Sequence, residues 1–322
     1  METSPQTVGS PSGVLETLAQ ELLVEQRRSR RWRIALSLGW LSFFFLLLFI
    51  ALGWAGGKRE GGSTEKHTSL VELKGAITAD SKASADRIIG ALQQAFKDKN
   101  TQGVVLRINS PGGSPVQAGY INDEIRRLRA KHKDIPLYVV VQDICASGGY
   151  YVAAAADKIF VDKASIVGSI GVLMDGFGFS GAMEKLGVER RLITAGENKG
   201  FLDAFSPANP EQQKLAAQMV AEIHQQFIKV VREGRGNRLK ETGDLFSGLV
   251  WSGAKSIELG LADGLGGLDF VAREIVKAEL VVDYTPDDTF SEQLARRLGA
   301  SAAETIMTRI LPAASSGGTV LH

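Results

Sequence analysis

The residue with the clearest capacity for chemistry in this sequence is Ser147, which lies between a hydrophobic run and two glycines. It belongs to residues 143–151, Asp-Ile-Cys-Ala-Ser-Gly-Gly-Tyr-Tyr, behind the β-branched run 137–141. Residues 150–156 favour a helix, so Ser147 should lie close to a helix N-terminus, where free N–H groups can stabilise an oxyanion. The pattern predicts a strand-to-helix turn that presents a nucleophile. A Ser-Gly-Gly turn without a catalytic role is the alternative.

A second glycine-rich loop, residues 109–115 (Asn-Ser-Pro-Gly-Gly-Ser-Pro), follows the hydrophobic run 104–108. Ligands of open α/β sheets bind beyond the carboxyl ends of the strands, which is where both loops are expected. Glycine adopts positive φ and lets a substrate backbone approach closely. The N–H groups of Gly112 and Gly113 are therefore candidates for a second oxyanion donor beside that of Gly148. A plain tight turn is the alternative here too.

A serine nucleophile needs a base, and no histidine is placed in a recognisable pattern near it. The four histidines are His67, His132, His224 and His322. Lysine is the alternative base, and it acts in its neutral form, which burial favours. Lys199 fits best, because in residues 195–203 it precedes a glycine and two apolar residues, and Ser169, in the small-residue segment 167–171, could orient its amine. A solvated loop lysine is the alternative interpretation of Lys199.

Composition limits the other classes of function. The chain has 322 residues, of which 44% are hydrophobic and 23% charged, and its formal charge of +1 gives no basic excess for nucleic acid. Its single cysteine, Cys145, excludes an intramolecular disulfide and a Cys-x-x-Cys metal site. It lies in an apolar run and is expected to be a small buried residue. We predict no metal site and no cofactor.

Residues 34–57 carry no charge and are long enough to cross a membrane. As a helix these 24 residues would span about 36 Å, against a hydrocarbon core of about 30 Å. Trp32 and Trp54 lie near the two ends, as interfacial aromatic residues do. Arginines precede the stretch, at positions 27, 28, 30, 31 and 33, and outnumber the two basic residues that follow it. The N-terminus should therefore stay in the cytoplasm, with the rest of the chain on the other side.

A cleaved signal peptide is the alternative, but this stretch is too long and begins too far into the chain. We therefore predict a retained anchor in the inner, cytoplasmic membrane. The expected organisation is a cytoplasmic segment at 1–33, a transmembrane anchor at 34–57, a linker at 58–67, a globular domain at 68–283 and a tail at 284–322. Residues 14–26 and 290–311 are candidate amphipathic helices.

The globular part alternates strand-like and helical patterns, which favours an α/β fold with a largely parallel sheet. Strands are expected at 70–73, 104–108, 137–141 and 158–161, and a further strand at 191–194. Helices are expected on the apolar faces Ile88, Ile89, Leu92 and Phe96, and then Ile121, Ile125 and Leu128. A long helix is expected at 211–234, with Leu215, Met219, Ile223 and Phe227 on one side, and a helix-turn-helix at 253–275.

Five motifs in order resemble those of the bacterial signal peptide peptidase A family. They lie at 109–115, 146–151, 167–172, the Lys199 loop and 260–266, so the resemblance covers about residues 68–283. It implies a Clp-protease/crotonase-like fold and a Ser-Lys peptidase of the short form. Ser147 matches the nucleophile, Lys199 the general base and Ser169 the serine that hydrogen-bonds the lysine. Gly113 and Gly148 match the oxyanion donors.

The expected function is that of a membrane-anchored serine endopeptidase, facing the periplasm or cell exterior, that degrades remnant signal peptides and similar extended apolar peptides. The resemblance also implies a homo-oligomeric ring in which Ser147 and Lys199 come from neighbouring protomers. Two rival functions use the same fold. One is a crotonase-type enzyme acting on acyl thioesters, and the other is a catalytically silent membrane scaffold. Cleavage of an apolar peptide separates the peptidase from both.

Overall fold

The computed structural model describes residues 30, 32–34, 36–49 and 64–286, in two units divided between Gly61 and Gly62. In the first unit, the described residues include one helix, Trp32–Phe49, that is long and apolar enough to cross a membrane. Its 18 residues span about 27 Å, close to the thickness of a hydrocarbon core. The rest of the predicted anchor, most of the linker and both candidate amphipathic helices lie outside the described residues.

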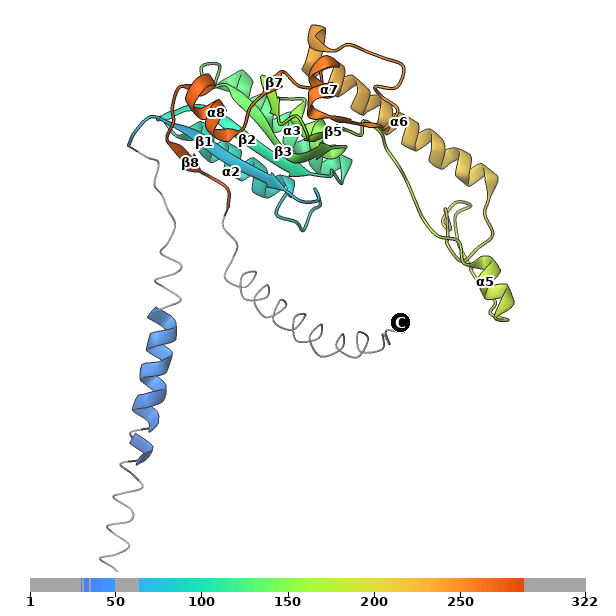
Figure 1. Ribbon diagram of the computed structural model, residues 1–322. Helices are drawn as coiled ribbons and strands as arrows, with labels where there is room; N and C mark the ends of the chain where they lie inside the picture. Colours follow the sequence, from blue (N-terminus) through green and yellow to red (C-terminus); the bar gives the residue numbers. More distant parts are fainter. Residues whose placement is uncertain (1–29, 31, 35, 50–63, 287–322) are drawn as a thin grey trace, which may run out of the picture. The chain divides into compact units, whose positions relative to one another are not determined.

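The second unit contains a mostly parallel sheet, which confirms the predicted α/β class (Figure 1). The strand order is β6-β5-β3-β2-β1-β8, with β4 beside β3 and β7 beside β4, and only the β5–β6 pair is antiparallel. The strands are β1 (His67–Lys74), β2 (Thr101–Ser110), β3 (Leu137–Ala146), β4 (Lys158–Val161), β5 (Ile166–Gly168), β6 (Val250–Ser252), β7 (Gly264–Leu265) and β8 (Val281–Asp283). The four strands expected before residue 162 are therefore all present.

The helices are α2 (Ala85–Lys97), α3 (Pro115–Lys131), α4 (Gly148–Ala153), α5 (Ser180–Lys185), α6 (Pro210–Arg235), α7 (Gly253–Glu258) and α8 (Leu268–Phe270), with the short turns η1 (Gly236–Arg238) and η2 (Val271–Val276). Helices α2, α3 and α4 pack on one face of the sheet, and α8 and η2 on the other, whereas α5 buries no residue. Helix α3 carries the predicted apolar face, and it begins at Pro115 because Ser114 caps it by accepting a hydrogen bond from the Gln117 N–H. The expected helix-turn-helix at 253–275 is interrupted by β7, so α7 and α8 are shorter than predicted.

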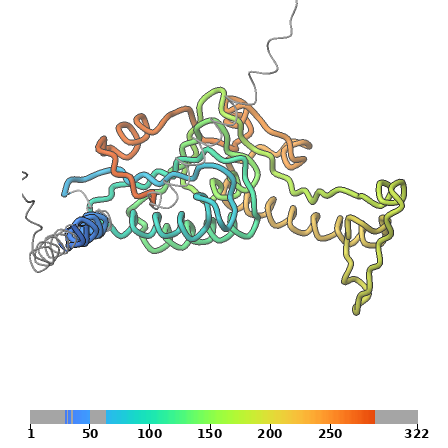
Figure 2. The backbone as a smooth tube through the Cα atoms, turned by 90° about the horizontal axis from the view of Figure 1, so that it is seen from below, coloured from blue at the N-terminus to red at the C-terminus, as the bar shows by residue number. Residues whose placement is uncertain are grey.

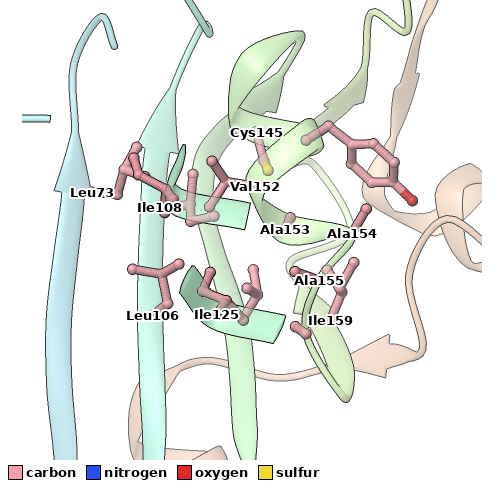
Figure 3. Packing of buried hydrophobic residues seen from close by; sticks show 14 of the residues in the cluster. Leu73, Leu106, Ile108, Ile125, Cys145, Val152, Ala153, Ala154, Ala155 and Ile159 are labelled. Carbon is pink, nitrogen blue, oxygen red and sulfur yellow. The ribbon is translucent and has the colours of Figure 1, made fainter. Parts of the chain in front are cut away.

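The main core lies between the sheet and the helices α2, α3 and α4. Leu73, Leu106 and Ile108 point from β1 and β2 toward Ile125 of α3, and the alanines that follow Val152 let α4 approach closely (Figure 3). Cys145 is fully buried in this core, and its burial raises the pKa of the thiol. The thiol is thereby held protonated, which confirms the expected role of a small buried residue.

The prediction of a strand at 191–194 is wrong. These residues have no regular secondary structure, and Ile193 is 96% exposed. A β-branched run becomes a strand only where a neighbour can pair with its backbone, and no strand of the described sheet does so here. They belong instead to a segment we call the arm, residues 172–209, which contains α5 and extends from the sheet beside α6 (Figure 2). The stripe on α6 is accordingly divided: Phe227 is buried, whereas Leu215 and Met219 are exposed.

Candidate active site

Ser147 occupies the predicted strand-to-helix turn, directly between the end of β3 and the start of α4. It is half-buried, and its backbone has φ 52° and ψ −123°, a conformation that residues other than glycine rarely adopt. Its N–H donates to the Gly168 carbonyl at 2.9 Å, and its own carbonyl accepts from the Tyr151 N–H at 3.0 Å. Strained residues held by their surroundings concentrate at functional sites. The fold thus fixes an unfavourable conformation at this serine.

The loop after β2 packs against this turn through Gly112, and the contact requires glycine. A Cβ built on Gly112 would lie 2.7 Å from the Ser147 Cβ and 2.7 Å from the Gly148 nitrogen. Gly112 also has φ 100°, and its carbonyl accepts from the Ile77 N–H at 2.8 Å. The two glycine-rich loops identified in the sequence therefore touch each other, as expected for loops at the carboxyl ends of neighbouring parallel strands.

The N–H groups of Gly113 and Gly148 lie close together and are unused. The position of a Cβ on Gly148 is 3.2 Å from the Gly113 nitrogen. Within residues 64–286, neither N–H donates a hydrogen bond to another protein group. Because both are backbone donors beside Ser147, they can bind an oxygen that becomes negative during attack on a carbonyl. The geometry supports the two predicted oxyanion donors.

Gly113→Ala should lower kcat for peptide cleavage by about 10² to 10³-fold, the typical loss when one oxyanion donor is misplaced. Gly113 has φ 149°, and a Cβ there would lie 2.3 Å from the Ile77 carbonyl oxygen, so the loop must shift. Initial rates with a fluorogenic apolar peptide, corrected for the folded fraction by circular dichroism, measure the effect. Gly119→Ala is the matched control, because no heavy atom lies within 4 Å of its Cβ position. Retention of more than a third of the parent kcat by Gly113→Ala would contradict the assignment.

Ser169 lies beside Ser147, just beyond the end of the neighbouring strand. In the parallel β3–β5 pair, Ala146 is opposite Gly168, so the two serines are the next residues of their strands. Ser169 also has a positive φ, 51°, and its N–H donates to the Leu249 carbonyl at 2.7 Å. The single chain therefore brings together four of the five predicted site residues, namely Ser147, Ser169, Gly113 and Gly148.

Lys199 is the fifth, and the single chain does not bring it to Ser147. It is an exposed residue of the arm, in a turn where its N–H donates to the Gly196 carbonyl at 3.1 Å (Figure 2). Its amine has no hydrogen bond or ion pair with any described residue. The predicted dyad is thus divided between the sheet and the arm.

The loop that carries Lys199 is nevertheless held firmly. Leu202 has φ 53°, and its N–H donates to the Gln212 side chain at 3.0 Å. Asp203 accepts from the Ser206 hydroxyl at 2.7 Å and pairs with Arg190 at 3.3 Å, and these two contacts lower the pKa of its carboxyl. The Phe179 and Phe205 rings of the arm stack on each other, with their centroids 5.5 Å apart. A loop that merely connected two helices would need none of these contacts, so the arm presents Lys199 from a defined platform.

A cavity of about 660 Å³ opens beside this platform, between the arm and the first turns of α6. Its apolar lining includes Leu173, Met174, Phe177, Leu202, Ala216 and Val220, and Gly200, next to the lysine, also lines it. The cavity is large enough for apolar side chains of a peptide.

Two polar contacts near the site were not anticipated from the sequence. Asn109 donates to the Asp143 carboxylate at 2.6 Å, across a bulge in which residues 142–144 of β3 face only Asn109 of β2. The bulge turns β3 away from β4 and toward β5, and so aims Ser147. The other contact is His224 of α6, whose Nε2 hydrogen-bonds the Ile170 carbonyl at 3.0 Å, one residue after Ser169. The Asn109–Asp143 contact could have been found from the sequence, because each residue follows a hydrophobic run that was predicted to be a strand. No local pattern indicated the contact of His224 with Ile170.

Within the described ranges, no three His, Cys, Asp or Glu side chains are grouped so as to hold a metal ion.

Comparison with known proteins identifies similar chains. The sequence model of peptidase family S49 matches residues 129–281 of this chain. The putative signal peptide peptidase SppA of Enterococcus faecium is 30% identical over 243 residues, which cover 71% of this chain and 70% of that protein. Protease 4 of Haemophilus influenzae is 30% identical over 223 residues, covering 68% of this chain and 35% of the relative.

A Brucella melitensis protein named Na(+)/H(+) antiporter NhaA is 44% identical over 211 residues. That match covers 64% of this chain but spans only 28% of the relative's length. The matched region is therefore a minor part of that longer protein, whereas the name refers to the whole of it.

Proposed function

Since this chain belongs to peptidase family S49, we propose that it is a serine endopeptidase with Ser147 as nucleophile and Lys199 as general base. The family and the protease names of its relatives make the chain a protease. Its mostly parallel sheet with flanking helices fits the Clp-protease/crotonase-like fold of the family. The observation that carries the proposed mechanism is the pair of unused N–H groups, on Gly113 and Gly148, beside a strained serine.

In this mechanism the Ser147 hydroxyl attacks the scissile carbonyl carbon while the neutral Lys199 amine takes its proton. The carbonyl oxygen becomes an oxyanion and accepts hydrogen bonds from the Gly113 and Gly148 N–H groups. The C–N bond then breaks, and the leaving amine takes the proton from Lys199. Water, deprotonated by the same lysine, hydrolyses the acyl-serine and regenerates the Ser147 hydroxyl. Ser169 accepts from or donates to the lysine amine and so orients it.

Lys199 can play this part only if it is brought to Ser147, because the single chain leaves it exposed in the arm. We propose that this happens between neighbouring protomers, in a homo-oligomeric ring where the arm of one chain brings Lys199 to Ser147 of the next. Support comes from large apolar side chains that the arm leaves exposed: Leu173, Phe177, Leu186 and Ile193. An apolar surface of this kind is typical of a surface that binds a partner.

The proposed location is the inner membrane, with a single-pass anchor at 34–57 that overlaps the apolar helix Trp32–Phe49, and with the peptidase domain, 68–283, outside the cytoplasm. The excess of arginine before the apolar helix supports this orientation. The proposed substrates are cleaved signal peptides and similar extended apolar peptides, bound by main-chain pairing along a strand edge. The apolar cavity next to Gly200 supports this class of substrate.

An acyl-enzyme trapped on Ser147 tests the nucleophile directly. The full chain in detergent is mixed with an activated ester of an apolar peptide, quenched in acid and digested for mass spectrometry. We expect one acyl group, on the peptide that contains Ser147, and none on the peptide with Ser169. Protein unfolded in urea serves as the control, because its serines lack a base and oxyanion donors. An adduct on another residue, or none under turnover conditions, would refute the assignment.

A further inference from the structure

The edge of the sheet opposite the active site is rich in lysine. We call it the amino edge, since β1, β2, β3 and β4 begin there and α2 and α3 end there. Six exposed lysines lie along it or in the segments that lead into it: Lys66, Lys97, Lys99, Lys131, Lys133 and Lys158. The active-site loops follow the carboxyl ends of the same strands, so the two features are at opposite ends of the sheet.

The arginines of this region have partners within the protein, but the lysines do not. Of the run 126–133, Arg126 pairs with Glu233 at 2.9 Å, Arg127 with Glu124 at 2.6 Å, and Arg129 with Asp157. None of the six lysines forms an ion pair with a described residue.

Few acids offset these lysines at the same edge. The exposed acids there are Glu65, Asp134 and Glu279, three against six lysines. Asp98 is occupied by the Tyr284 hydroxyl at 2.6 Å, and Asp157 pairs with Arg129. The edge is therefore locally cationic in a chain whose overall formal charge is only +1.

Helix capping accounts for part of this pattern only. Lys97 and Lys131 are in the last turns of α2 and α3, where positive charge complements the helix dipole. Lys99, Lys133 and Lys158 lie outside the helices, so the dipole does not explain them.

A cavity of about 260 Å³ lies between the ends of α2 and α3. It is lined by Gln93, Lys97, Arg127, Leu128, Lys131 and His132. Two lysine amines beside a small open cavity suit a phosphate-bearing group, because each donates charge-assisted hydrogen bonds to its oxygens, whereas Arg127 is already paired with Glu124.

The path of the chain indicates which phosphate-bearing partner this is. The chain enters the described domain at the amino edge, where the His67 N–H donates to the Asn100 carbonyl at 3.0 Å, and the segment before it leads back to the apolar helix. The tether of a membrane-anchored chain would thus attach at the lysine-rich edge.

We propose that the amino edge binds anionic phospholipid headgroups and docks the domain on the membrane surface, leaving the Ser147 edge free for peptides. This inference rests on the proposed membrane anchoring. Each lysine near an anionic surface contributes roughly a fivefold gain in binding.

Lysine labelling tests the proposal on the full chain. The chain is reconstituted in nanodiscs of phosphatidylcholine alone or mixed with phosphatidylglycerol, acetylated briefly, and the modification of each lysine is measured by mass spectrometry. We expect labelling of Lys97, Lys99 and Lys131 to be slowed about threefold or more in the anionic discs. Lys163 and Lys214, away from the amino edge, should label at equal rates in both.

A charge reversal gives a second readout. Lys131→Glu should restore the labelling of Lys97 in anionic discs, whereas Lys214→Glu, the matched control, should leave it slowed. Equal labelling in both kinds of disc would overturn the proposal. So would the same slowing by millimolar inorganic phosphate in neutral discs, which would indicate a site for free phosphate.

The same discs separate this proposal from the function on which it rests. Retention of the chain in neutral discs tests the anchor alone, and cleavage of a soluble peptide tests the active site alone. A chain that is retained and cleaves, but shows no difference in labelling, fails only the docking proposal.

Discussion

Ser147→Ala should reduce kcat for an apolar peptide by about 10⁴-fold or more, because no other group can form the acyl-enzyme at this site. The backbone N–H groups of Gly113 and Gly148 remain, so the residual rate should still exceed that of the uncatalysed reaction. Purified full chain in detergent, a fluorogenic apolar peptide and protein concentrations from absorbance, corrected for the folded fraction, provide the measurement. KM should change little, since the hydroxyl contributes to the chemical step rather than to binding.

Ser147→Gly separates loss of the nucleophile from loss of structure. The φ of 52° at this position strains alanine and serine but not glycine. We therefore expect Ser147→Gly to be as inactive as Ser147→Ala but more stable by about 1 kcal/mol, seen as a higher Tm. Cleavage by Ser147→Ala within tenfold of the parent would place the nucleophile elsewhere, and an unstable, inactive Ser147→Gly would contradict the strain argument.

The elements that could be predicted from the sequence are those specified by their own side chains. Helices α2 and α3 follow from their apolar faces, which recur at helical spacing. The turn at Ser147 belongs to the same class, because Gly148 and Gly149 leave room for the loop after β2 to pack against it. Local chemistry of this kind survives folding because the tertiary structure agrees with it.

The elements that were missed depend on residues far away in the chain. Strands β5 and β8 have three residues each, which is too few to show a period in the sequence. They form because the backbones of β3 and β1 are free to pair with them. The bulge at residues 142–144 likewise exists only where β3 leaves β4 for β5. The strand expected at 191–194 is the converse error: its side chains suit a strand, but the arm has no edge to pair with.

The candidate site divides in the same way. Ser147, Gly113 and Gly148 lie in loops whose glycines indicate unusual backbone conformations, and these residues meet in the folded chain. Lys199 lies 52 residues further on in an exposed arm, and nothing in its neighbours fixes its distance from Ser147. In the proposed mechanism these two residues meet only in an assembly of chains, so their pairing leaves no signature in the local sequence or in the fold of one chain.

Lys199→Ala should abolish cleavage nearly as completely as Ser147→Ala, by about 10³-fold or more, because the serine hydroxyl would lose its only base. Binding of a substrate analogue should remain, since the cavity beside Gly200 does not depend on the amine. Lys214→Ala is the matched control and should keep full activity, because Lys214 is an exposed residue of α6 that does not line the cavity. Steady-state rates and analogue titrations of the three proteins measure these effects. Near-parental cleavage by Lys199→Ala would remove the dyad.

Mixing the two inactive variants tests whether the dyad is shared between chains. When Ser147→Ala and Lys199→Ala chains are co-expressed with different tags and co-purified, some interfaces combine an intact serine with an intact lysine of the neighbour. Random assembly gives such a pair at about one quarter of all interfaces, and selection for mixed rings raises this to about a third in the smallest rings, so activity should return to roughly a quarter to a third of the parent. If each dyad forms within one chain, every site lacks one residue and no activity returns. The separation of the exposed Lys199 from Ser147 in the single chain is the reason to expect recovery.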